Sequence, residues 1–319
     1  MERRKRAFKR QILHHSYQRT ADGYLLFYNV SDHLAFFTLF CILARKYDIT
    51  VLSLCQMPDH IHHATRPDRA RQLSDFVGEY TRRFSRESNE VCHRHGPLFE
   101  SPFGSAVKNG DKKGRSTLLY IGNNPVERRI RKRAVAYRWN YLAYYKNTHP
   151  FSDELIIRKA SPALRRAVRE VDSCFRSGLP LRYSLLQRLF RPIDNRERQQ
   201  LTDHIISIYN VIDYEQAIRF FGSYEDMIAA MDADTGSEYD INEVFFGKDD
   251  SQYARMSAIA GRMYPDVHDA LAASPDERFE LLQRLMRETR AAPGQIARFL
   301  RMRLGSGNNP DLDVSLPEQ

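Results

Sequence analysis

The chain has 319 residues, of which 42% are hydrophobic and 28% are charged. This composition is typical of a soluble globular protein with one large domain or two ordinary ones. No run of about 18 apolar residues occurs, so a membrane span is excluded, and no apolar run of a signal peptide follows the basic first residues. The four cysteines are scattered, which excludes a CxxC metal or redox motif and indicates a reducing, cytoplasmic location.

Charge divides the chain into two unlike parts. Residues 1–150 hold 27 Lys and Arg against 13 Asp and Glu, a net charge of +14, whereas residues 151–319 hold 22 against 27, a net charge of −5. Nine of the eleven histidines also lie in the first part. A basic surface confined to one part of a chain is the usual signature of a nucleic-acid partner, although it also occurs as a solvated face.

The first 130 residues alternate between strand and helix patterns. Short β-branched runs predict strands, and apolar residues at a spacing of three or four predict helices. In chain order we expect a strand at 11–19, a helix at 31–47, strands at 49–54 and 60–65, a helix at 69–90, an extended segment at 97–107 and a helix at 113–123. This order predicts an α+β fold in which helices pack on an antiparallel sheet.

Beyond residue 150 the pattern becomes helical throughout. We expect an all-α accessory domain at 151–304 and a disordered tail at 305–319, which is rich in Gly, Asn, Pro and Asp. Residues 277–302 are similar to the first two helices of a helix-turn-helix, but no recognition helix follows them. They therefore form either an incomplete module or two packed helices.

The segment Met57-Pro58-Asp59-His60-Ile61-His62-His63 contains the first candidate site residues. Alternate residues of a strand point to the same face, so His60 and His62 project together while His63 points away. Two imidazoles held in this way form half of a divalent-metal site. The alternative is a chance pair in a histidine-rich chain.

The second candidate segment is Tyr120-Ile121-Gly122-Asn123-Asn124-Pro125-Val126. Tyr120 and Asn124 are four residues apart, so they share a face of a helix. An amide oxygen is a ligand that Mg²⁺ or Mn²⁺ accepts, and a tyrosine hydroxyl is a nucleophile once its target is activated. By itself, Tyr120 is also compatible with a buried core aromatic.

Together these segments resemble the single-tyrosine HUH transposases, in particular the branch of REP-associated tyrosine transposases. Further matching stretches are 14–19, 96–103 and 137–141, so the resemblance covers residues 11–146. It implies a ferredoxin-like HUH domain at 1–150 and a metal-dependent single-stranded DNA endonuclease and strand transferase. His60, His62 and Asn124 would bind Mg²⁺ or Mn²⁺, and Tyr120 would attack the scissile phosphate to give a 5′-phosphotyrosine intermediate.

The implied partner is single-stranded or hairpin DNA, and a homodimer is a further expectation. Two basic clusters are the candidate DNA-binding residues, because phosphate contacts come chiefly from Lys and Arg, although each is also compatible with a solvated face. They are Arg82, Arg83 and Arg86 in the helix at 69–90, and Arg128, Arg129, Arg131, Lys132 and Arg133 after the tyrosine.

Two alternatives stay open. A domesticated or inactive relative would bind structured nucleic acid without cutting it. A replication-initiator or relaxase-like nickase would use related chemistry, but such proteins usually carry a helicase part or a three-histidine cluster, and the sequence contains neither. Nicking of hairpin DNA in the presence of Mg²⁺ separates an active enzyme from an inactive relative.

Overall fold

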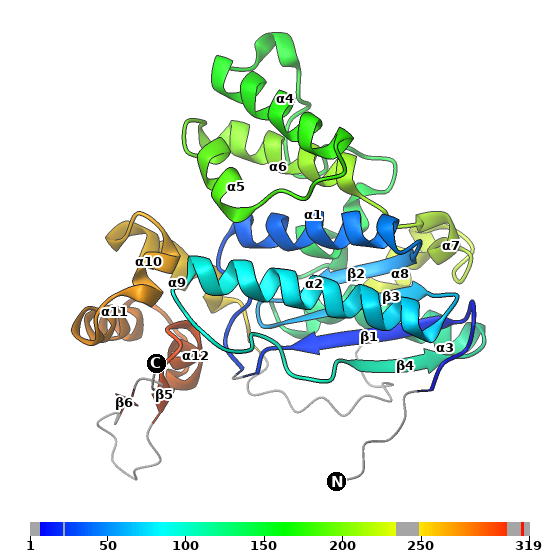
Figure 1. The fold of residues 1–319 in the computed structure, drawn as a ribbon, viewed down its shortest axis with the longest axis horizontal. Coiled ribbons are helices and arrows are strands. Elements are labelled where there is room, and N and C mark those ends of the chain that lie inside the picture. The colour runs from blue at the N-terminus through cyan, green and yellow to red at the C-terminus, as the bar shows by residue number, and fades with distance from the viewer. Residues whose placement is uncertain (1–6, 22, 234–248, 305–313, 316–319) are drawn as a thin grey trace.

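The fold is built on an antiparallel four-stranded sheet (Figure 1). The computed structural model describes residues 7–21, 23–233, 249–304 and 314–315. The strand order is β2-β3-β1-β4, with bounds β1 Leu13–Arg19, β2 Thr50–Gln56, β3 His60–Arg66 and β4 Gly104–Lys108. Strand β3 pairs with β2 on one side and β1 on the other, so its backbone is hydrogen-bonded along both edges.

The hairpin between β2 and β3 places the histidine motif at one end of the sheet. The backbone N–H of Met57 donates to the carbonyl of His60 at 2.9 Å and closes the turn. The turn is held from outside as well, because the N–H groups of Leu26 and Phe27 donate to the Pro58 carbonyl at 2.7 and 3.2 Å. The start of β3 is therefore fixed by backbone bonds on two sides.

Helices cover both faces of the sheet. Helices α1 (Val30–Lys46) and α2 (Ala70–Val91) lie on one face, and α3 (Asp111–Glu127) lies on the other. Helix α1 begins with a capping box, in which the Asn29 side chain accepts from the Asp32 N–H and the Asp32 carboxylate accepts from the Asn29 N–H. Helix α3 is longer than the sequence predicts, because it continues through Pro125 to Glu127 rather than ending at Asn123.

The chain after residue 150 is helical, as expected. Its helices are α4 Pro162–Arg176, α5 Tyr183–Phe190, α6 Asn195–Tyr209, α7 Tyr214–Ile218, α8 Tyr224–Ala233, α9 Gln252–Met263, α10 Val267–Ala272, α11 Pro275–Glu288 and α12 Pro293–Phe299. A short two-stranded hairpin, β5 (Arg303–Leu304) with β6 (Val314–Ser315), follows them. Apart from β6, the tail at 305–319 lies outside the described residues.

The hydrophobic core is shared between the two parts of the chain. Buried side chains of α4, α5, α6, α7 and α8 belong to the same cluster as those of the sheet, α1, α2 and α3. Helices α9 to α12 enclose a second cluster, which also takes in Leu25, Tyr28 and Cys92. The α+β fold with helices packed on an antiparallel sheet is confirmed, whereas the division of the chain near residue 150 stays a prediction.

Candidate active site

The two motif histidines lie on the face of β3 that α3 covers. His60 is 3% exposed and His62 is fully buried, and their ring centroids are 4.8 Å apart. His63 points to the opposite face, where its Nε2 lies 3.1 Å from the Tyr80 hydroxyl of α2. Strand alternation thus separates the three histidines as the sequence predicts.

Helix α3 brings Tyr120 to the same place. The Tyr120 side chain is 4% exposed, and its ring centroid lies 5.3 Å from that of His62 in an edge-to-face arrangement. Asn124 is one helical turn further along and is 1% exposed. The structure therefore brings the tyrosine into contact with a motif histidine from a distant part of the chain.

His15 of β1 is a member of this cluster that sequence reasoning missed. Its Nε2 lies 3.0 Å from Nδ1 of His62, and its ring centroid lies 5.7 Å from that of Tyr120. Tyr17 pairs directly with His62 across the two strands, which puts His15 on the same face two residues away. The only sequence signal was a histidine inside the first predicted strand, and that signal does not give the pairing register.

Each motif histidine has its Nδ1 engaged by a neighbour. Nδ1 of His60 lies 2.5 Å from the Asp59 carboxylate, and Nδ1 of His62 faces His15. Burial lowers the pKa of His62 well below its ordinary value, and the nearby charges of His60 and Arg19 lower it further. His62 is therefore neutral at neutral pH, which is the form that binds a metal ion.

The donor set fits a hard divalent cation. Both polar side-chain atoms of Asn124, Oδ1 and Nδ2, are buried and have no hydrogen-bond partner among the residues that the structure describes. A buried amide normally finds partners, so an oxygen left in this way one helical turn from Tyr120 suits a ligand position. Within the described part of the chain, no three His, Cys, Asp or Glu side chains gather in a metal-binding arrangement.

The pKa of Asp59 is also shifted by its neighbours. Burial raises the pKa of this carboxyl, but His60, through its charge and its hydrogen bond, lowers it, and Arg128 and Arg298 add to this effect. The net result is a pKa below the ordinary value. Asp59 is consequently ionised and able to accept a hydrogen bond from the Nδ1–H of His60. The lone pair of that ring is then on Nε2, which is the atom available to bind a metal ion.

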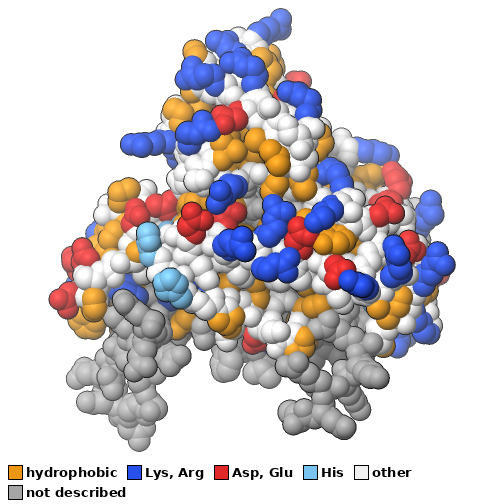
Figure 2. All heavy atoms as spheres, in the orientation of Figure 1, with side chains coloured by type: hydrophobic (Ala, Val, Ile, Leu, Met, Phe, Trp, Pro, Cys, Tyr) orange, Lys and Arg blue, Asp and Glu red, His pale blue; other side chains and the backbone are white. Residues whose placement is uncertain are grey.

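The basic clusters predicted to bind DNA lie on opposite faces of the sheet. Arg82, Arg83 and Arg86 are exposed on α2, away from Tyr120, and Figure 2 shows Lys and Arg side chains over α2 and α4 on that side. After α3, the side chains of Arg129, Arg131, Lys132 and Arg133 are exposed, and Arg133 forms an ion pair with Asp232 at 2.8 Å. Arg128 differs, because it is only 5% exposed and lies 3.8 Å from the carboxylate of Asp250.

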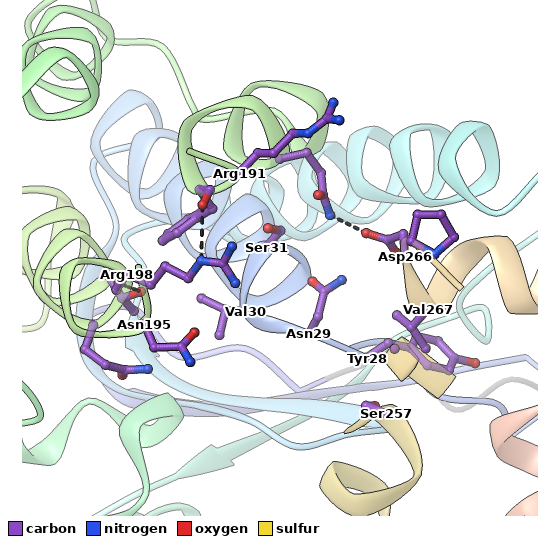
Figure 3. A pocket seen from close by; sticks show the side chains of 16 residues that line it. Tyr28, Asn29, Val30, Ser31, Arg191, Asn195, Arg198, Ser257, Asp266 and Val267 are labelled. Atoms are coloured by element: carbon purple, nitrogen blue, oxygen red, sulfur yellow. Dashed lines mark hydrogen bonds between the residues drawn. The ribbon is translucent and has the colours of Figure 1, made fainter. Parts of the chain in front are cut away.

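A separate cavity of about 670 Å³ opens where three groups of helices meet (Figure 3). Its walls come from the start of α1, from α5 and α6, and from α9 and the start of α10. Arg198 lines it, with its Nε donating to the carbonyls of Phe190 and Ile193 at 3.1 Å each. The candidate catalytic residues are not among those that line this cavity.

Comparison with known proteins gives one family match. Residues 23–123 match the family model described as transposase IS200 like. No curated protein matches the chain. A solved structure of a REP-associated tyrosine transposase bound to a REP hairpin is similar at 15% identity and a TM-score of 0.38, covering 44% of this chain and 81% of that one. None of the helices among the described residues is long and apolar enough to span a membrane. The residues that match this family model include the histidine motif and Tyr120.

Proposed function

We propose that the chain is a metal-dependent single-stranded DNA endonuclease and strand transferase that uses Tyr120 as its nucleophile. The observation that carries this proposal is the contact between Tyr120 and His62, with Asn124 one turn further along α3. The family match supports a transposase, and the REP-associated branch and its hairpin substrate rest on the resemblance of the sequence motifs.

His60, His62 and Asn124 would hold Mg²⁺ or Mn²⁺. A divalent cation in this place polarises the scissile phosphate and offsets the charge that develops on it. Asp59 and His15 occupy the Nδ1 atoms of the two imidazoles and so orient their Nε2 atoms toward the site. A homodimer is compatible with this site and stays a prediction.

The chemistry of Tyr120 is a transesterification. Its hydroxyl oxygen bonds to the scissile phosphorus while the bond from phosphorus to the 3′ oxygen breaks. The tyrosine proton is lost and the leaving 3′ oxygen gains one, which gives a 5′-phosphotyrosine link and a free 3′-OH. A 3′-OH that later attacks this link rejoins the strands and restores the tyrosine, without an external energy source.

The exposed cations that follow α3 are suited to bind the DNA next to the cleaved bond. Arg129, Arg131 and Lys132 come within a few residues of the helix that carries Tyr120. Phosphate contacts of this kind position a strand without reading its sequence. The arginines of α2 lie on the other face, so they would contact only a DNA segment that passes around the domain.

The test is covalent capture of DNA. The full-length protein is incubated with 5′- and 3′-labelled single-stranded hairpins, taken from inverted repeats beside the gene, in the presence of Mn²⁺, Mg²⁺ or a chelator. We expect a denaturant-resistant protein–DNA species that contains the 3′-side fragment and that the chelator abolishes. Tight hairpin binding without any adduct would instead indicate a relative that binds structured DNA without cutting it.

A further inference from the structure

Asp250 is a buried carboxylate from the second part of the chain that lies against the end of the catalytic helix. It is 5% exposed and lies just before α9. Its backbone N–H donates to the Arg128 carbonyl at 2.9 Å, and its Oδ2 lies 3.8 Å from Nη1 of the same arginine. Asp250 therefore contacts Arg128 through both its backbone and its side chain.

Arg128 connects this contact to the candidate metal site. It caps the C-terminus of α3, where its N–H donates to the carbonyl of Asn124 at 3.0 Å. Its positive charge also acts on Asp59, the carboxylate that is bonded to His60. One buried arginine thus contacts Asp250, is bonded through its backbone to Asn124, and carries a charge that lowers the pKa of Asp59.

Two further contacts support α3 from the same part of the chain. A Cβ atom on Gly122 would lie 2.5 Å from the sulfur of Met231 in α8, and one on Gly114 would lie 2.5 Å from the Phe220 ring. The guanidinium of Arg115 donates to the Phe220 carbonyl at 3.1 Å. These close approaches show that helices beyond residue 150 hold α3 near its start and middle, while Asp250 holds its end.

We infer that Asp250 is a positioning residue for the candidate active site, acting through Arg128 to fix the end of α3 and the placement of Asn124. This inference rests on the proposed function. Loss of the Asp250 charge removes one of the two carboxylates whose charges act on Arg128, so the buried guanidinium would shift from its place at the end of α3. Because α3 also carries Tyr120, a small shift of its last turns would misplace the groups that must align with the phosphate.

The experiment uses the full-length protein with the substitution Asp250→Asn, which keeps the shape and removes the charge. Asp249→Asn is the matched control, since it makes the same change one residue earlier, where the carboxylate accepts only from Ser251 within the described contacts. Asp250→Glu is the conservative variant and keeps a carboxylate within reach of Arg128. Hairpin affinity, the single-turnover rate of adduct formation and hydrogen exchange in residues 120–128 are measured for each.

For Asp250→Asn we expect adduct formation to slow by about tenfold or more, with hairpin affinity changed by less than about threefold, because misalignment affects the reacting groups more than the DNA contacts. Exchange at the end of α3 should become faster. Asp249→Asn should behave as wild type, and Asp250→Glu should recover most of the lost rate.

Several results would overturn the inference. An Asp250→Asn protein with unchanged hydrogen exchange in α3, or with an unchanged rate of adduct formation, would contradict the inference. So would equal losses of hairpin affinity and of adduct rate that parallel a lower melting temperature, because they would indicate general destabilisation. If the wild-type protein formed no adduct with any hairpin, the proposed function would fail instead. The exchange of residues 120–128 would then decide by itself whether Asp250 fixes the end of α3.

Discussion

The candidate site is organised around the unequal roles of neighbouring side chains on one strand. His60 and His62 face Tyr120 and have polar neighbours at Nδ1, whereas His63 lies among the aromatic rings of α1 and α2. A single residue of register shift would exchange these environments. The environment of each histidine therefore depends on its position on β3, and variants of the individual residues distinguish the proposed roles.

Replacement of Tyr120 by Phe should abolish the covalent DNA adduct while leaving fold and hairpin binding intact. The ring keeps its contacts with His62 and His15, and only the nucleophilic oxygen is lost. The matched control is Tyr80→Phe, because Tyr80 is also a buried tyrosine beside a histidine but lies on the other face of the sheet. An adduct formed by the Tyr120→Phe protein on a denaturing gel would mean that another residue is the nucleophile.

His60→Ala and His62→Ala should each remove metal-dependent cleavage, whereas His63→Ala should retain it. The first two variants lose proposed ligands. The third leaves a cavity among Phe40, Phe76 and Tyr80, which costs roughly 2 kcal/mol of folding stability by analogy with other large-to-small core changes. Cleavage rates as a function of Mn²⁺ concentration, measured well below the melting temperature, test this. Equal loss in all three variants would contradict the assigned roles.

At the scale of elements, local patterns predicted most of the first part of the chain. Strand alternation and helical spacing gave β1, α1, β2, β3 and α2 to within a few residues, because these signals depend on neighbours in sequence. The expected end of the third helix at residue 123 was wrong, because α3 continues through Pro125 to Glu127. A proline inside a helix removes one backbone hydrogen bond and crowds the preceding turn, a cost that packing can offset.

The candidate site residues could be named from the sequence for the same reason, and their roles stay predictions. His60, His62, Tyr120 and Asn124 lie in two short motifs, so their spacing was visible in the sequence, and the structure places them on facing surfaces. His15 and Asp250 reach the cluster only through contacts across 47 and 122 positions of the chain. The close packing of α3 was not visible in the sequence either, since Met231 lies where a side chain at Gly122 would be.

Glycine-to-alanine variants test this packing of α3. Alanine normally stabilises a helix by about 1 kcal/mol relative to glycine, and we expect this gain for Gly78→Ala in α2, where an added Cβ meets no atom within 4 Å. Gly114→Ala should instead destabilise the protein by roughly 1–3 kcal/mol, because its Cβ would overlap the Phe220 ring. Urea denaturation measures both, and an equal gain in the two variants would show that Phe220 does not pack against α3.

At the scale of the whole molecule, buried histidines predict how stability varies with pH. Burial lowers the pKa of His33 and His63 to about 3, below the ordinary value near 6.5. Both are neutral in the folded protein and gain protons on unfolding below pH 6.5, so their contribution is complete above that pH and is lost as the pH falls. Each of these two histidines lowers the free energy of unfolding by roughly 1.4 kcal/mol per pH unit as the pH falls below 6.5. Chemical denaturation at pH 7.5 and pH 5.5 should therefore show lower stability at the acidic pH.

His268 affects the pH dependence of stability in the opposite direction. Burial lowers its pKa, but the carboxylates of Asp32 and Asp266 outweigh burial and hold it well above the ordinary value. Its stabilising charge contributes fully below pH 6.5, and this contribution is lost progressively as the pH rises from there through the raised pKa. His268→Gln should therefore narrow the stability difference between pH 7.5 and alkaline pH, as measured by the same denaturation. If the loss of stability at alkaline pH were the same in His268→Gln as in the wild type, the proposed contribution of the His268 charge would be contradicted.

The distribution of charge and motifs predicts that residues 1–150 suffice for catalysis, but the packing of the chain leads to a different expectation. Buried residues of α6 and α8, such as Ile205, Tyr209 and Met231, belong to the same core as the sheet and α1. The Arg45 guanidinium donates to the Tyr209 carbonyl at 2.8 Å, and the Asp213 N–H donates to Val51 of β2 at 2.8 Å. A fragment that ends at residue 150 loses these partners and exposes the apolar surface that they cover.

We therefore expect the 1–150 fragment to be unfolded or aggregation-prone and to form no DNA adduct. Co-expression with residues 151–319 should partly restore both folding and adduct formation. Circular dichroism, gel filtration and adduct formation on hairpin DNA measure the outcome for the fragment, the co-expressed pair and the full chain. The charge distribution leads to a separate expectation for affinity: a fragment that folds keeps the +14 part and loses the −5 part, so it should bind DNA more tightly, and this binding should weaken steeply with salt. A folded fragment that nicks hairpins at the full-length rate would show that the helices beyond residue 150 are dispensable for holding α3, and the positioning role of Asp250 would fall with it.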